Sequence, residues 1–182
     1  MEINNSVLNK DINLLSIEDF DLDIFEDLIR LKRIYKCLFS DSNTLFFAFR
    51  REENLTDKKE LKKLKVRILE SFKDYGEYII LKELDSSRFD SVGRININDH
   101  TYNFLFDVWK YFYSCTFFIP TEKFNFFDYI TFQKKNRFHD IGNEKLLINH
   151  YANFSCIKGL GGDNLIISYR NDFKLPDLPI RL

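Results

Sequence analysis

The apolar run Thr44–Phe49, with the sequence TLFFAF, predicts a buried strand, since short stretches of aromatic and apolar residues suit strands that lie inside a protein. Outward from it, Glu77–Leu84 (EYIILKEL) predicts a second strand. In Arg94–Asn98 (RININ), apolar and polar residues alternate, which is typical of a strand at the edge of a sheet. The middle of the chain therefore contributes several strands.

The C-terminal third has a similar pattern. Leu146–Tyr151, Phe154–Lys158 and Leu165–Arg170 each predict a strand. The last two flank the glycine-rich segment Gly159–Asn164, which favours a hairpin turn. Consecutive strands joined by a short turn indicate an antiparallel sheet.

Helical spacing is clearest in Ile17–Leu38, where apolar residues recur at steps of three and four. Ser16 is a suitable residue to cap the start of this helix, and several acids lie in the turns that follow Ser16. Basic residues from Arg30 to Lys36 lie near the end of the helix, so the charges at both ends complement the helix dipole. Three further helices are expected over Thr56–Tyr75, Thr101–Cys115 and Thr121–Lys135, the second of them capped by the residues from Asn98 to His100.

Together these elements predict an α+β fold, with helices packed on one face of a largely antiparallel sheet. The chain has 182 residues, 45% of them hydrophobic, and contains no tract that indicates a linker, so residues 1–182 are expected to form a single globular domain. With 20 Phe and 9 Tyr, the core is expected to be rich in aromatic rings.

The composition argues against several classes of protein. The scattered Cys37, Cys115 and Cys156 offer neither a disulfide framework nor paired metal ligands. No stretch is apolar enough for a signal or a membrane span, so we expect a cytoplasmic protein without a membrane partner. The basic segment Lys58–Lys73 is interrupted by acids, and the net charge is −1, which makes nucleic acid an improbable partner.

Acidic residues are concentrated near the beginning of the chain. Residues 1–29 hold eight acids against Lys10, whereas residues 30–75 hold 13 basic and 7 acidic residues. The cluster comprises Glu18, Asp19, Asp21, Asp23, Glu26 and Asp27. These acids fit ordinary capping of a helix start, and they also fit a surface that occupies a basic cleft in a protein partner.

Candidate catalytic groups are few and scattered. The loop Gly159–Asp163 lacks the strand-to-helix context of a phosphate site, and His139-Asp140 lacks the further ligands of a metal site. His150 and Cys156 are six residues apart, too far along an extended strand to form a nucleophile and base pair, although a turn at Asn153 would let them approach. No catalytic residue, metal ligand or cofactor is predicted.

The sequence therefore favours a non-catalytic protein-binding function through an acidic surface that bears aromatic residues. The concrete hypothesis is a bacterial immunity protein that neutralises a cognate toxin, such as a nuclease. The alternative is a small enzyme or nucleotide-binding domain that uses the loop Gly159–Asp163 with His139, Asp140 or His150.

Overall fold

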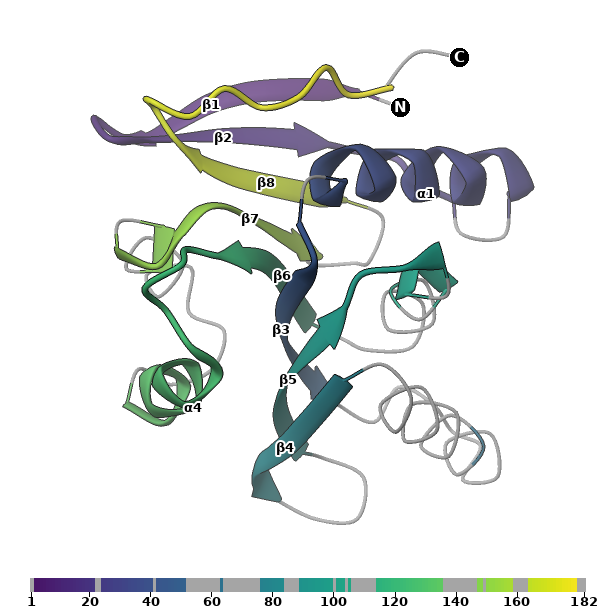
Figure 1. Cartoon of the computed structure of the whole chain (residues 1–182). Helices are drawn as coiled ribbons and strands as arrows, with labels where there is room; N and C mark the ends of the chain where they lie inside the picture. Colours follow the sequence, from purple (N-terminus) through teal and green to yellow (C-terminus); the bar gives the residue numbers. More distant parts are fainter. Residues whose placement is uncertain are drawn as a thin grey trace.

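A single antiparallel sheet organises the computed structural model of the chain (Figure 1). The structure describes residues 2–21, 24–40, 42–51, 63, 76–83, 89–99, 101–103, 105, 114–135, 147–148, 150–158 and 164–179. Eight strands pair in the order β1-β2-β8-β7-β6-β3-β5-β4, and each neighbouring pair is antiparallel. Together with its helices, this sheet confirms the predicted α+β fold.

The strands are β1 (Ile3–Asn9), β2 (Ile12–Ile17), β3 (Thr44–Arg51), β4 (Gly76–Glu83), β5 (Phe89–Asn96), β6 (Ser114–Pro120), β7 (Ala152–Lys158) and β8 (Leu165–Arg170). The two helices with full bounds are α1 (Phe25–Phe39) and α4 (Phe126–Lys135). In Figure 1 the strand direction turns progressively from β1 toward β4, as the twist of a large sheet requires.

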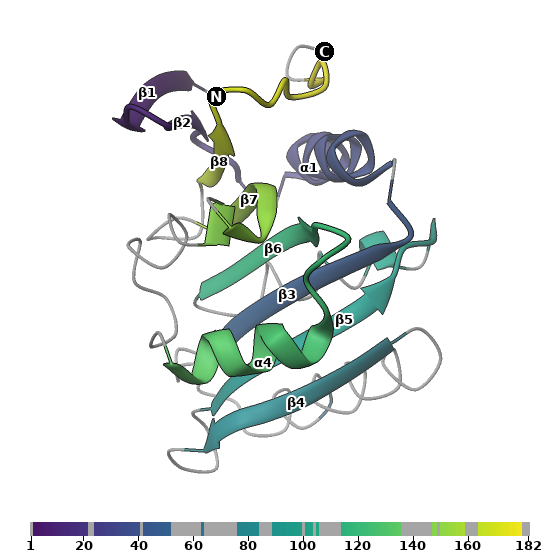
Figure 2. The same ribbon diagram turned by 60° about the vertical axis from the view of Figure 1, so that its left-hand side comes forward.

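The two helices α1 and α4 pack on opposite faces of the sheet, so the prediction that the helices share one face is wrong. Leu45 and Phe47 of β3 belong to the same buried cluster as the apolar side of α1, whereas Phe46 and Ala48 belong to the cluster under α4. Figures 1 and 2 show the two helices on either side of β6 and β3. The physical reason lies in the run TLFFAF: its side chains point alternately to both faces and all are apolar, so both faces need a cover.

The α1 face is the larger of the two. It extends across β2, β8, β7, β6, β3 and β5, and its centre holds the fully buried Tyr35 of α1, whose ring centroid lies 5.9 Å from that of Phe117. Gly93 makes room for a ring on this face. A Cβ atom at position 93 would lie 2.3 Å from Cζ of Phe47, so only glycine fits opposite that ring.

The α4 face combines a group of closely packed rings with a few aliphatic side chains. Tyr129 of α4 is fully buried, and its ring centroid lies 4.9 Å from that of Phe118 and 5.5 Å from that of Phe46. Phe124, on the turn before α4, stacks on Tyr151 at 4.0 Å. The aromatic-rich core predicted from the sequence is present, and its densest part lies on this face.

The strands predicted at Thr44–Phe49, Glu77–Leu84, Phe154–Lys158 and Leu165–Arg170 are confirmed as β3, β4, β7 and β8. Of two other strand predictions, one is wrong only in its position in the sheet and the other is wrong in kind. Arg94–Asn98 falls at the end of β5, which lies between β3 and β4 rather than at an edge. Leu147, Ile148 and His150 are helical, and the Tyr151 N–H donates to the Leu147 carbonyl at 2.7 Å, a helical contact that a strand does not make.

The predicted helix Ile17–Leu38 is wrong at its beginning. Residues 12–17 form β2, which pairs with β1 on one side and β8 on the other, and the helix begins only at Phe25. The N-terminal hairpin was not predicted, because its polar first strand has no buried face.

The remaining helix predictions differ in outcome. α4 begins at Phe126 rather than Thr121. A helical segment does start after Asn98, whose Oδ1 accepts the Thr101 N–H at 3.1 Å, but Cys115 lies in β6. Lys63 is helical, and the rest of Thr56–Tyr75 lies outside the described residues.

Candidate functional site

The acidic residues predicted to bind a partner lie in and after the loop that joins β2 to α1. Phe20 in this loop is buried in the α1 face, whereas its neighbours Asp19 and Asp21 are exposed. Asp19 has a backbone φ of 64°, in the left-handed region that aspartate tolerates better than most residues. The anchored Phe20 and the turn at Asp19 together direct both carboxylates outward.

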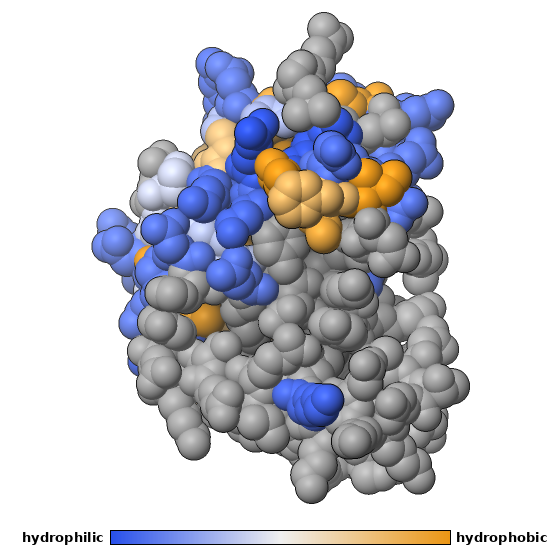
Figure 3. Space-filling model, turned by 90° about the vertical axis from the view of Figure 1, so that its right-hand side faces the viewer, coloured by the Kyte–Doolittle hydropathy of each residue, from blue (hydrophilic) through white to orange (hydrophobic). Residues whose placement is uncertain are grey.

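The first residues of α1 add an apolar centre to this acidic loop. Ile24 is 45% exposed, Phe25 is 69% exposed, and Glu26 is exposed beside them. Figure 3 views the molecule toward this end of α1 and shows a hydrophobic cluster with hydrophilic side chains above it and on its left. We call the surface formed by Asp19, Asp21, Ile24, Phe25 and Glu26 the α1 patch.

Two of the six predicted acids have structural contacts instead. The Asp27 carboxylate lies 3.0 Å from Arg30 Nη1 and also accepts the Asp21 backbone N–H at 3.0 Å. Glu18 accepts a hydrogen bond from the Ser16 hydroxyl at 3.0 Å, and its backbone N–H donates to the Glu2 carbonyl. Asp23 lies outside the described residues, and the remaining Asp19, Asp21 and Glu26 are exposed.

The basic end of α1 is engaged within the protein. Lys36 Nζ lies 3.0 Å from the Asp99 carboxylate and 5.4 Å from the centroid of the Tyr102 ring, and Lys32 donates to Asn103 Oδ1 at 2.9 Å. These contacts dock α1 against the helical segment that follows β5. The two ends of α1 therefore differ: Lys32 and Lys36 contact the helical segment after β5, whereas Glu26 is exposed at the first turn.

Phe25 is not among the residues predicted from the sequence to bind a partner. Ile24 falls within the apolar spacing of the predicted helix Ile17–Leu38, whereas in the structure it is exposed at the point where α1 begins. The available signal was Phe25 itself, a large ring at a position outside the apolar spacing of the helix. An aromatic residue on a polar face is informative, because a large exposed apolar side chain costs solubility without adding to the core.

The residues of the alternative enzymatic hypothesis are not brought together in the described part of the chain. His139, Asp140 and Gly159–Asp163 lie outside the described residues. His150 is exposed, whereas Cys156 is fully buried on β7, so the imidazole and the thiol do not form a solvent-accessible pair. Among the described residues, no three His, Cys, Asp or Glu side chains gather as metal ligands would.

Burial also makes Cys115 a poor nucleophile. Its thiol is fully buried in the α1 face, and this burial raises its pKa from 9.0 to about 12, although the nearby Lys158 acts in the opposite direction. Burial in turn lowers the pKa of Lys158. Because the thiolate is the reactive form of cysteine, Cys115 is inert at neutral pH.

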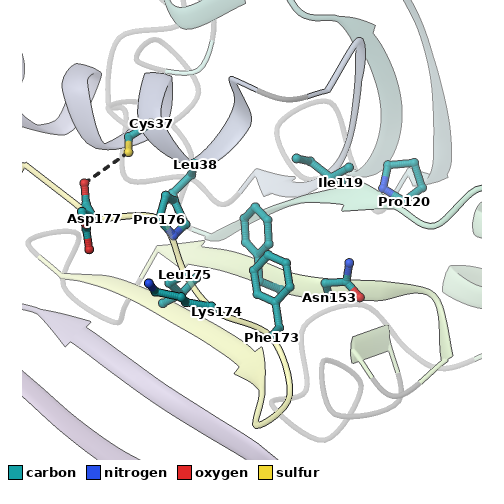
Figure 4. Close-up of a pocket in the computed structure, with 11 residues that line it drawn as sticks. Cys37, Leu38, Ile119, Pro120, Asn153, Phe173, Lys174, Leu175, Pro176 and Asp177 are labelled. Carbon is teal, nitrogen blue, oxygen red and sulfur yellow. Dashed lines mark hydrogen bonds between the residues drawn. The ribbon is translucent and has the colours of Figure 1, made fainter.

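A hollow of about 510 Å³ lies at the other end of α1 (Figure 4). Its walls are largely apolar, including Leu38, Phe154 and Phe173, and the Cys37 thiol donates to the Asp177 carbonyl across a 3.4 Å distance. Lys174 and the Asp177 carboxylate are its charged groups among the described lining residues. In this hollow the acceptor of the Cys37 thiol at 3.4 Å is a backbone carbonyl, which does not act as a general base.

The class of protein that these observations define is an α+β domain with one twisted antiparallel sheet, a helix on each face and an acidic patch around exposed apolar residues. No protein-family model, curated protein or solved structure matches the chain. In the described residues, we find no helix with the length and apolar character to cross a membrane.

Proposed function

We propose that this chain is a non-catalytic binding protein that recognises a protein partner through the α1 patch. The observation that carries the proposal is the 69% exposure of Phe25, close in the chain to the exposed Asp19, Asp21 and Glu26. Within this class, we propose an immunity protein that neutralises a cognate bacterial toxin, with a nuclease as the type of toxin that the acidic surface fits best.

An exposed phenylalanine on a helix provides an anchor for binding. Side chains near the centre of an interface contribute most of its binding energy when they enter an apolar pocket of the partner. Phe25 is held by the first turn of α1, whose buried residues include Leu31 and Ile34. The ring is thus presented from a rigid element, which limits the entropy lost on binding.

The carboxylates around Phe25 select the kind of partner. Asp19 and Asp21 in the loop before α1 and Glu26 in its first turn are exposed and add negative charge to this surface. An enzyme that acts on nucleic acid carries a basic cleft for phosphates, and such a cleft attracts carboxylates for the same electrostatic reason. A partner held there would be blocked from its substrate without any chemistry by this chain.

The experiment uses co-expression, with the product of the neighbouring reading frame in the source genome as the probe, because immunity proteins are commonly encoded beside their toxins. Expression of that product alone is expected to arrest bacterial growth, and co-expression of this chain to restore it. Phe25→Ala is expected to weaken binding of the purified pair by at least about 30-fold, as expected for a residue at the centre of an interface.

A second variant tests the charges separately. Asp19→Asn, Asp21→Asn and Glu26→Gln together remove the negative charge and keep the side-chain shapes, and asparagine also tolerates the backbone of position 19. This triple variant is expected to slow association most strongly at low salt. Asp27 is left unchanged because of its contacts with Arg30 and Asp21.

Phe127→Ala is the matched control. Phe127 lies at the start of α4, is 75% exposed and is on the opposite side of the sheet from the α1 patch. This variant is expected to bind and protect as the wild type does. Equal affinities of the Phe25→Ala and wild-type chains would rule out the α1 patch, and growth arrest that this chain does not relieve would argue against the immunity function.

A further inference from the structure

The strand β1 is an unprotected edge of the sheet. Its residues from Ile3 to Leu8 are all exposed, with Ile3 at 42% and Val7 at 67%, so neither of its faces is covered. It pairs with β2 on one side, and no described strand pairs with its other side. In Figure 2, β1 is the outermost strand and the C-terminal segment runs away from it toward α1.

Edge strands usually carry features that prevent pairing with another chain, such as a charged residue, a proline or a bulge. The sequence INNSVLN of β1 contains no charge and no proline. Its one irregularity in register lies between Val7 and Asn9, next to the hairpin turn, so Ile3 to Val7 form a regular strand. This edge is therefore open to a further strand.

The hydrogen bonding of β1 shows which backbone groups are available. The Glu2 carbonyl accepts the Glu18 N–H, so the main chain at residue 2 points toward β2. Backbone groups alternate in direction along an antiparallel strand. The N–H and carbonyl groups of Ile3, Asn5 and Val7 consequently point away from the sheet.

The β1 strand of a second copy, placed antiparallel to the first, can form hydrogen bonds with these outward N–H and carbonyl groups in one symmetric register. If Asn5 lies opposite Asn5 of the second copy, then Ile3 lies opposite Val7 of the second copy, and the reverse pair forms as well. Ile3 and Val7 project on the same side of the strand, so each apolar side chain meets an apolar partner.

The charges that flank β1 favour the same orientation. Glu2 precedes the strand and Lys10 follows it at the turn. Antiparallel apposition brings Glu2 of one copy toward Lys10 of the other at both ends of the pair, whereas parallel apposition would bring like charges together. The Asp11 backbone N–H, next to Lys10, donates to the Asn9 side-chain oxygen at 2.7 Å and so stabilises the turn.

We propose that two copies of this chain associate through antiparallel β1–β1 pairing, which continues the sheet across a two-fold axis at Asn5. The pairing is isologous, so it closes at the dimer and leaves no further β1 edge open. It uses a surface distinct from the α1 patch and does not depend on the proposed function.

The test is sedimentation velocity of the full chain over a series of concentrations, with substitutions at the two-fold axis. The wild type is expected to shift from monomer to dimer as concentration rises. Asn5→Lys is expected to remain monomeric, because it places two ammonium groups directly opposite each other. Asn5→Glu is expected to be monomeric for the corresponding reason, and an equimolar mixture of the two variants is expected to form a heterodimer.

Asn43→Lys is the matched control, since Asn43 is an exposed asparagine before β3, away from β1. It is expected to dimerise as the wild type does, and thermal melts of all variants check that each is folded. A wild type that is monomeric throughout the series would overturn the proposal. So would a dimer that persists in Asn5→Lys, a mixture that remains monomeric, or assemblies larger than a dimer.

Discussion

Helices α1 and α4 each bury one tyrosine against the sheet, but they are held by different means. Tyr129 of α4 is surrounded by rings from β3, β6 and the preceding turn, and its hydroxyl accepts a hydrogen bond from Gln133 at 3.2 Å. Tyr35 of α1 lies near the thiols of Cys115 and Cys156, and burial raises its pKa well above the ordinary value. One face is an aromatic cluster, and the other mixes rings with ionisable groups.

The two helices also differ in the hydrogen bonds at their first residues. Asn125 precedes α4, its Oδ1 accepts the Asp128 N–H at 3.0 Å, and the Asp128 carboxylate faces the Asn125 N–H in return. Ile24 precedes α1 and has no side-chain hydrogen bond to the helix. The residue before α4 caps its helix with a side chain, whereas at the start of α1 the Asp27 carboxylate accepts the Asp21 backbone N–H instead.

The largest effect is expected from removing the ring at the centre of the α4 face. Tyr129→Ala should lower the free energy of unfolding by about 3–5 kcal/mol, because it leaves a cavity among several aromatic side chains. Urea denaturation measures the change. Phe127→Ala on the exposed side of the same helix should cost less than about 0.5 kcal/mol, and a similar cost for both variants would show that the face is not packed as described.

The α1 face is expected to respond to alkaline pH. Because the pKa of Cys115 is about 12 in the folded protein against 9.0 for an unperturbed thiol, the unfolded chain loses this proton first as pH rises. Stability is therefore fully present below pH 9 and falls above it, by about 1.4 kcal/mol for each pH unit until the folded thiol also ionises.

Cys115→Val isolates this contribution. The drop in unfolding free energy between pH 7 and pH 10 should be smaller in the variant by about 1.4 kcal/mol, as measured by urea denaturation at both values. Other titrating groups, including Lys158, are common to both proteins. An unchanged drop would show that the Cys115 thiol is accessible and titrates normally in the folded state.

The smallest effect is expected at the helix starts. Asn125→Ala should cost about 1 kcal/mol, since it removes the side-chain acceptor at the start of α4. Ile24→Ala removes no hydrogen bond and should change stability by less than about 0.5 kcal/mol. Thermal unfolding of both variants compares the two helices directly, and equal losses would contradict the difference in capping.

The sequence pattern correctly predicted the strands that consist of short apolar runs. The strands β3, β4, β7 and β8 follow from short apolar runs, and the antiparallel sheet follows from their spacing. The position of β5 inside the sheet did not follow from its alternating sequence, because strand order depends on pairing with distant segments such as β3 and β4. The run TLFFAF shows that both faces of β3 are apolar, but it does not show which distant helix covers each face.

The candidate site was predicted only in part. A cluster of acids is visible in the sequence, but the separation of exposed Asp19 from Asp27, which is bonded to Arg30, depends on where the helix begins. The sequence supported a start at Ser16, because the three- and four-residue spacing extends back through Phe20 and Ile17. In the structure both residues are buried, but Ile17 lies at the end of strand β2 and Phe20 lies in the loop that follows it.

The close approach of Phe47 to Gly93 links two positions that are 46 residues apart in the chain, since the β3–β5 register sets them side by side. A Cβ atom at position 93 would also lie 2.9 Å from the Glu77 carbonyl oxygen of β4, so a smaller residue at position 47 alone does not make room for a side chain at position 93. In a lineage that descends from this sequence, position 93 is therefore expected to remain glycine whichever residue occupies position 47.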